Sequence, residues 1–163
     1  MKNRLDSLKI EPVGKLRFLT FNFLEFRFFW NSENGKAMVF GTPRLLEPLV
    51  VVPYMLASEV GNFRGKKYFV KLKSQIAAVF ILTIRHDSLI VSGLAVSPGY
   101  RRLGLGFFIL NWTENLCKRT KVEWLQLVVL KGNTPAQHLY QKFGFKITIE
   151  RKMSLTLRKR IQT

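Results

Sequence analysis

The segment from Arg101 to Gly106 carries two arginines and two glycines whose types and spacing could bind phosphate. Arg101 and Arg102 precede Gly104-Leu105-Gly106, and the apolar residues after this loop recur at helical spacing. The first N–H groups of a helix have no acceptor within the helix, and glycines leave them open to a ligand. The segment therefore predicts a phosphate site where a helix begins. The alternative is an ordinary tight turn between a strand and a helix.

Apolar patterns on either side of the loop predict the elements that position it. Leu89–Val91 and Leu94–Val96 predict a strand before the loop. Pro98-Gly99 predicts a type II turn, because proline presets φ and glycine accepts a positive φ. The helix after the loop is predicted by a stripe of five apolar residues, Leu105, Phe108, Ile109, Trp112 and Leu116.

The spacing excludes two common nucleotide sites. A dinucleotide fingerprint needs a third glycine, and Ile109 stands there. A nucleotide P-loop ends in Gly-Lys-Ser/Thr, which does not occur in the sequence. What remains is an arginine, two residues and Gly-x-Gly at a helix start. This pattern resembles the acyl-coenzyme A pyrophosphate loop of the GNAT superfamily of N-acetyltransferases, Arg/Gln-x-x-Gly-x-Gly/Ala.

A second segment, Asn133–Phe145, supports the resemblance. Thr134 is predicted as a helix N-cap, Pro135 as the first helical residue and Gly144 as the helix end. One apolar face is predicted from Ala136, Leu139, Tyr140 and Phe143. The string is similar to the second GNAT signature, Asn-x-x-Ala-x-x-Leu/Phe-Tyr-x-x-x-Gly-Phe. A predicted strand, Val122–Leu130, lies between the two signatures, where the family has its fifth strand.

The resemblance implies an α+β fold of three layers (α/β/α), in which helices flank a mixed central sheet. It implies one domain over residues 1–163, with a cofactor-binding core at 66–157 and a divergent part at 1–65 that shapes the acceptor site. Residues 68–72 and 77–84 predict two strands of a hairpin around the short turn at 73–75. Alternating apolar and polar residues predict two closing strands at 146–149 and 153–157. Leu16–Trp30 is rich in phenylalanine and predicts one or two strands, and Leu45–Val60 predicts one or two helices.

The resemblance also implies roles for single residues, with acetyl-CoA as the co-substrate and no metal. Main-chain groups of Leu94, Ala95 and Val96 would bind the pantetheine arm, and the Asn133 side chain would hydrogen-bond the cofactor. The pyrophosphate would be held by the loop, Arg101, Arg102, Leu103, Gly104, Leu105 and Gly106. The Tyr140 hydroxyl would protonate the leaving sulfur as the catalytic general acid. From its spacing alone, Tyr140 is equally a core aromatic residue.

The sequence shows no general base. Many family members place a glutamate on the strand before the loop or on the strand before Asn133, and neither strand carries one here. Asp87 and Glu123 stand at the strand starts, too far from the reacting centre. His86 is predicted in a hairpin turn, and His138 on the exposed side of its helix. A water chain or a residue of the N-terminal part is left to take the proton.

Three functions therefore stay open. The first is transfer of an acetyl group to an amine by direct attack, on a protein N-terminus, a lysine, a peptide or a small molecule. The second is an acyl-CoA-binding regulator without catalysis. The third is a basic RNA- or ribosome-associated protein that uses the same fold as a scaffold.

Composition adds a strong positive charge. The chain has 27 Lys and Arg against 10 Asp and Glu, a formal net charge of +17. The excess fits an acidic partner, RNA or the ribosome, or else a generic basic surface. The single cysteine, Cys117, is predicted as a packed thiol, and it excludes a disulfide within the chain and fits a cytoplasmic location. With one cysteine and two histidines, no structural zinc site is expected. No apolar run approaches the ~20 residues of a membrane span, and either a monomer or a homodimer is expected.

Overall fold

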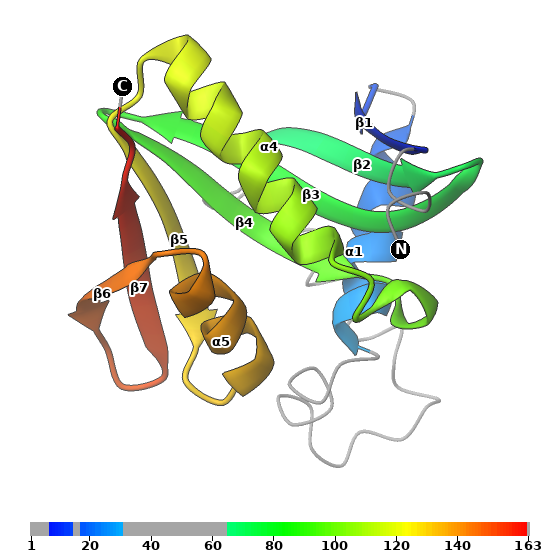
Figure 1. Ribbon diagram of the computed structural model, residues 1–163. Coiled ribbons are helices and arrows are strands. Elements are labelled where there is room, and N and C mark those ends of the chain that lie inside the picture. Colours follow the sequence, from blue (N-terminus) through cyan, green and yellow to red (C-terminus); the bar gives the residue numbers. More distant parts are fainter. Residues whose placement is uncertain (1–6, 15–16, 31–64, 163) are drawn as a thin grey trace. The chain divides into compact units, whose positions relative to one another are not determined.

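The strands form one mixed sheet with helices beside it. The computed structural model describes residues 7–14, 17–30 and 65–162 (Figure 1). The seven strands lie in the order β1-β2-β3-β4-β5-β7-β6. The elements in chain order are β1 (Leu8–Pro12), α1 (Phe18–Trp30), β2 (Lys66–Leu72), β3 (Gln75–Arg85), β4 (Ser88–Val96), the 3-10 helix η4 (Pro98–Tyr100), α4 (Leu105–Thr120), β5 (Trp124–Leu130), α5 (Thr134–Lys142), β6 (Lys146–Glu150) and β7 (Ser154–Arg160).

The described residues divide into two compact units that share β3 and β4. The first unit holds the described residues up to Ile81 together with Gly93–Arg101, and the second holds Leu82–Ser92 and the described residues from Arg102 onward. The expectation of one domain over residues 1–163 stays a prediction. No helix in the described part of the chain is long and apolar enough to cross a membrane.

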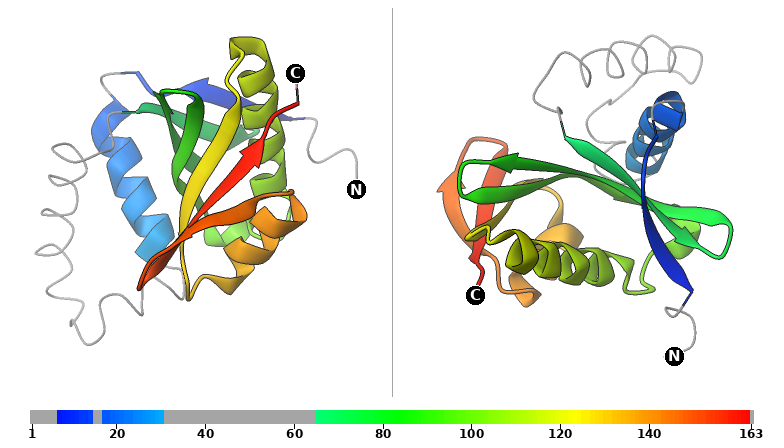
Figure 2. Two further views of the ribbon diagram at one scale, coloured as in Figure 1. Left: turned by 90° about the vertical axis from the view of Figure 1, so that its left-hand side faces the viewer. Right: turned by 90° about the horizontal axis from the view of Figure 1, so that it is seen from above.

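In the first unit, α1 packs on β2 and β3 (Figure 2). Phe21 and Phe28, seven positions apart and thus on one helix face, bury their rings against Phe69, Val79 and Ile81. β1 runs antiparallel to β2, from Leu8↔Leu72 to Pro12↔Tyr68. This burial of large apolar side chains holds the helix on the strands.

The prediction of strands over Leu16–Trp30 is wrong, because residues 18–30 form the helix α1. The dense phenylalanines favour a strand by propensity, but packing against β2 and β3 selects the helical spacing. The buried positions Phe21, Asn22, Glu25 and Phe28 follow that spacing, while Phe23 is exposed. Strand β1 was not expected from the sequence. The predicted helices at Leu45–Val60 lie outside the described residues.

In the second unit, β5 is paired on both sides. It runs parallel to β4 from Ser88↔Trp124 to Val91↔Leu127, and antiparallel to β7 from Trp124↔Arg160 to Leu130↔Ser154. β6 completes an antiparallel pair with β7. Helix α4 buries a stripe of five side chains, Leu105, Ile109, Leu110, Thr113 and Cys117. The structure confirms the predicted hairpin, the strand before the phosphate loop and the helix after it. It also confirms the strand before Asn133 and the two closing strands.

The three basic residues at the end of β7 form ion pairs with residues outside the strand. Arg158 pairs with Asp87, Lys159 with Glu114 and Arg160 with Glu123. Arg158 also lies over the ring of Trp124, 4.4 Å from its centroid. These three cations therefore fasten β7 to its neighbours, in addition to whatever they contribute to the surface charge.

Candidate functional site

The predicted phosphate loop is the start of α4. Gly104 is the N-cap in the left-handed conformation, with φ 81°, and nothing lies within 4 Å of the position its Cβ would take. The first hydrogen bond of the helix runs from the Phe108 N–H to the Gly104 carbonyl, 3.0 Å. The N–H groups of Leu105, Gly106 and Phe107 therefore have no acceptor within the helix. Free N–H groups, the helix dipole and an open glycine are what an anion needs.

The two arginines of the loop have different surroundings. The Arg101 guanidinium donates through Nε to the Val96 carbonyl, 3.2 Å, and through a terminal nitrogen to the Phe28 carbonyl, 3.1 Å. It thus ties the end of β4 to the last part of α1 within the first unit. Arg102 is exposed and has a positive φ of 62°. Binding of phosphate by either side chain stays a prediction, and Arg102 is the better placed to turn toward a ligand.

The turn before the loop differs from the predicted type II turn. Pro98–Tyr100 forms one turn of 3-10 helix, closed by the Tyr100 N–H on the Ser97 carbonyl, 2.9 Å. Gly99 does not adopt a positive φ, so the type II prediction is wrong. Proline fits because its fixed φ suits the first position of a helical turn.

The residues predicted to bind pantetheine lie at the end of β4, and all three are half-buried. The parallel pairing of β4 with β5 ends at Val91↔Leu127, so these three residues lie beyond its last pair. The Val96 carbonyl already accepts from Arg101. Main-chain binding of a ligand by these residues stays a prediction.

Asn133 is the N-cap of α5, where Thr134 was predicted. The Asn133 Oδ1 accepts from the Ala136 N–H, 3.2 Å, and Thr134 is the first helical residue. Asparagine is among the best N-cap residues, so the correction moves the helix start by one position. With Oδ1 engaged in the cap, the predicted hydrogen bond to a cofactor would come from the Asn133 amide nitrogen.

Tyr140 is the buried residue of α5. Its ring meets Phe145 edge-on, with 5.9 Å between centroids, and the Tyr140 carbonyl accepts from the Phe145 N–H. Gly144, with φ 93°, makes this reversal possible and ends the helix as predicted. The hydroxyl has no hydrogen bond to another residue of the described part. Burial raises the pKa of Tyr140 to about 12, so the phenol is protonated at neutral pH and has a proton to donate.

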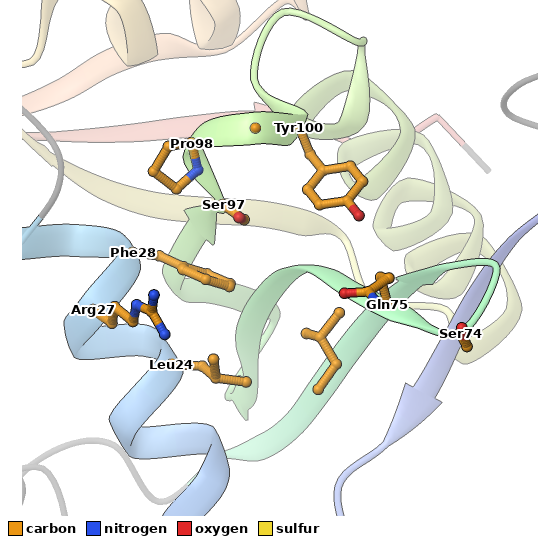
Figure 3. Close-up of a pocket in the computed structure, with 10 residues that line it drawn as sticks. Leu24, Arg27, Phe28, Ser74, Gln75, Ser97, Pro98 and Tyr100 are labelled. Atoms are coloured by element: carbon orange, nitrogen blue, oxygen red, sulfur yellow. The ribbon is translucent and has the colours of Figure 1, made fainter.

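A pocket of about 600 Å³ opens in the first unit, where β4 ends. Figure 3 shows its lining side chains around a common space, from α1, the β2–β3 turn and the segment after β4. Its lining is mixed, with Leu24, Phe28 and Tyr100 beside Arg27 and Ser97. A space of this size fits a small-molecule ligand or part of one.

Sequence reasoning missed one buried carboxylate, that of Glu25 in α1. Glu25 is 3% exposed, and its carboxylate forms no hydrogen bond or ion pair with another residue of the described part. Burial raises the pKa of Glu25 to about 7, against an opposing influence of Lys67. The sequence feature that could have revealed it is the single acidic residue in the apolar run 18–30, which stands at helical spacing from Phe21 and Phe28. The expectation of strands in that run concealed it.

The exposed position predicted for His138 and the packed thiol predicted for Cys117 are confirmed, while the distance of Asp87 and Glu123 from a reacting centre stays a prediction. His86 and His138 are exposed. Asp87 and Glu123 form ion pairs with Arg158 and Arg160 of β7. Cys117 is fully buried, and burial raises the pKa of its thiol to about 11, so it is a packed thiol. Among the residues that the structure describes, no group of three metal-ligating side chains occurs.

The structure brings the predicted site residues together within each unit. Leu94, Ala95, Val96 and Arg101 lie in the first unit, beside the pocket and Glu25's helix. Residues 102–106, Asn133 and Tyr140 lie in the second, where Gly106 of the loop packs on Leu139 of α5. The chain passes from one group to the other between residues 101 and 102.

Comparison with known proteins places the chain in one family. Residues 44–145 match the family described as the Acetyltransferase (GNAT) family. A curated relative, the putative [ribosomal protein bS18]-alanine N-acetyltransferase of Bacillus subtilis (strain 168), is 37% identical over 60 residues, which are 37% of this chain and 40% of the relative. The match thus spans well under half of that protein.

Solved structures share the fold at low identity. The PaiA N-acetyltransferase of Thermoplasma acidophilum, in complex with coenzyme A, superposes with a TM-score of 0.74 at 17% identity, over 94% of this chain and 99% of that one. The ribosomal-protein-S18-alanine N-acetyltransferase of Escherichia coli gives 0.68 at 17% identity, over 96% and 95%. The predicted fold, a mixed sheet with flanking helices, is confirmed. The chain belongs to the acetyltransferase (GNAT) family.

Proposed function

We propose that this chain transfers an acetyl group from acetyl-CoA to an amine by direct attack of the amine on the thioester. The observation that carries the proposal is the start of α4, where Gly104 is open and three helix N–H groups lack acceptors within the helix. A family relationship to acetyltransferases and a similar fold that holds coenzyme A support it.

The residues present fit acetyl-CoA by their donors. The N–H groups at the start of α4 would hold the pyrophosphate, with Arg102 adding charge. Main-chain groups at Leu94–Val96 would hold the pantetheine arm. Acetyl-CoA supplies the activated acetyl group, and the protein contributes by positioning the amine against it. Tyr140, protonated at neutral pH, would donate its hydroxyl proton to the departing sulfur.

For the acceptor, we propose the α-amino group of a protein N-terminus. Support comes from the names of two similar proteins, one by sequence and one by fold, which are given as alanine N-acetyltransferases of ribosomal protein S18. This assignment would place the reaction in the cytoplasm, where ribosomal proteins are made.

A second function, association with a polyanion such as RNA or the ribosome, is favoured by the charge balance. Every acidic residue of the described part except Glu25 is already in an ion pair with a basic residue. From Leu105 to the end of the described part, six basic residues are in no ion pair: Arg119, Lys121, Lys142, Lys146, Arg151 and Lys152. Retention of RNA that declines steeply with salt would support this function, and no retention at low salt would end it.

The test of the transferase is turnover. The protein is mixed with acetyl-CoA and a panel of free peptides and polyamines, and release of the coenzyme A thiol is followed. Amine-dependent release supports the proposal. If acetyl-CoA raises the melting temperature but no amine releases thiol, the chain is a cofactor-binding regulator without catalysis.

A further inference from the structure

The Glu25 carboxylate occupies the space that a side chain at residue 93 would need. A Cβ at residue 93 would overlap Oε1 of Glu25 and would lie 3.0 Å from Cδ. Gly93 also has a positive φ of 57°. Only glycine satisfies both conditions, so β4 carries a glycine where the α1 carboxylate meets it.

This contact places the carboxylate next to the segment of β4 that is predicted to bind the pantetheine arm. Gly93 directly precedes Leu94–Val96, the main chain proposed to hold the pantetheine arm. Neither β4 nor β5 carries a carboxylate between residues 89 and 96 or 125 and 130. Glu25 brings one to β4 from a neighbouring helix instead.

The surroundings of Glu25 suit a group that exchanges protons. Glu25 is 3% exposed, and Ile81 of the buried cluster lies beside the same position of Gly93. Lys67 of β2 is the charged residue among those described that acts on the carboxyl. Burial opposes ionisation more than Lys67 favours it, so the pKa of this carboxyl rises to about 7. A buried acid without a partner lowers stability, and such groups cluster at functional sites.

We propose that Glu25 is the general base of acetyl transfer in this chain, taking the proton of the acceptor amine directly or through a water molecule. This inference rests on the proposed function. It fills the role for which the sequence offered only a water chain or a residue of the N-terminal part.

The step balances with the groups already named. The amine nitrogen forms a bond to the acetyl carbonyl carbon, and the carbon–sulfur bond breaks. The proton leaves the nitrogen for the Glu25 carboxylate, and the departing sulfur takes a proton from the general acid. Glu25 then returns its proton to solvent, and the general acid regains one.

The experiment compares Glu25→Gln and Glu25→Asp with the wild type in thiol release against pH. The matched control is Glu11→Gln, which removes a carboxylate of the same unit that is ion-paired with Lys71. We expect Glu25→Gln to lower kcat by about 100-fold at pH 8, the usual range for lost general-base catalysis. Acetyl-CoA should still raise its melting temperature as in the wild type.

The pH profile separates a base from a packing residue. In the wild type and in Glu25→Asp the rise of activity with pH should show two ionisations, one of the carboxyl group at position 25 and one of the acceptor amine. Glu25→Gln should lose the first and keep the second. Glu11→Gln should match the wild type. A Glu25→Gln variant that turns over at the wild-type rate with an unchanged profile overturns the inference. A wild type that binds acetyl-CoA but acetylates no amine overturns the proposed function, and the inference with it.

Discussion

Leu139 of α5 packs against Gly106 of α4 so closely that a Cβ on residue 106 would lie 2.6 Å from its Cδ2. The glycine thus lets the two motif helices approach each other at the start of α4. The second glycine of the loop therefore has a packing role in addition to leaving the N–H groups open.

This contact predicts a coupled pair of substitutions. Gly106→Ala should lower the free energy of unfolding by about 1 kcal/mol, because overlap with Leu139 exceeds the gain in helix propensity. In a Leu139→Ala background the same change should stabilise the protein by up to about 1 kcal/mol. Urea unfolding of the four proteins measures the coupling. Equal effects of Gly106→Ala in both backgrounds would show that the contact is not strained by a methyl group.

The first glycine of the loop should act through its backbone alone. Gly104→Ala meets no neighbour but keeps a left-handed φ of 81°, so it should cost about 1 kcal/mol of stability. It should also reduce the rise in melting temperature that acetyl-CoA causes. Gly99→Ala is the control, since Gly99 has open space and no positive φ. Equal acetyl-CoA shifts in both variants would argue against the loop as the phosphate site.

Much of the fold could be predicted from the sequence where motif and periodicity agreed. Helix α4 and the apolar face of α5 around Tyr140 are both marked by spacing and by a flanking glycine. Of the stripe predicted for α4, however, only Leu105 and Ile109 are buried, because the buried face is turned toward Leu110, Thr113 and Cys117. The failures lie where local chemistry allowed two answers. Pro98-Gly99 suits a 3-10 turn as well as a type II turn, and Asn133 and Thr134 are both good N-caps.

The candidate site was predictable only in part, because its contacts are long in sequence. Local spacing placed the phosphate loop, but it could not show that Arg101 bonds the carbonyl of Phe28, or that Glu25 meets Gly93. Both contacts depend on α1, and its phenylalanines indicated strands. A correct helix would have put Glu25 on the buried face from the outset.

Tyr140→Phe tests the proposed acid. The ring packs on Phe145 and the hydroxyl has no partner in the described part, so removing the oxygen should change stability by less than about 1 kcal/mol. Loss of the proton donor should lower kcat by roughly two to four orders of magnitude, with acetyl-CoA binding retained. Steady-state kinetics on a confirmed acceptor decides. A wild-type kcat would make Tyr140 a core residue only, with water protonating the sulfur.

Glu25 should also make stability depend on pH. Its pKa rises in the folded state from the usual 4.5 to about 7, so the folded protein holds a proton there that the unfolded chain releases. The contribution of Glu25 to stability therefore falls as pH rises through this window, by about 3 kcal/mol in total.

Glu25→Gln cannot titrate and should lack this fall. Its unfolding free energy should resemble that of the wild type near pH 4.5 and exceed it above pH 7. Urea unfolding of both proteins across this range gives the difference. Two parallel curves would show that Glu25 titrates normally in the folded protein.

The most direct test of the account is acetyl transfer to a peptide with a free N-terminus. Wild-type protein, acetyl-CoA and an alanine-initiated ribosomal-protein peptide are incubated, and the product is analysed by mass spectrometry. The matched peptide has a blocked N-terminus and the same lysines. We predict one acetyl group on the α-amino nitrogen of the free peptide and none on the blocked one. No acetylation of either peptide, by a protein that acetyl-CoA stabilises, would contradict the account.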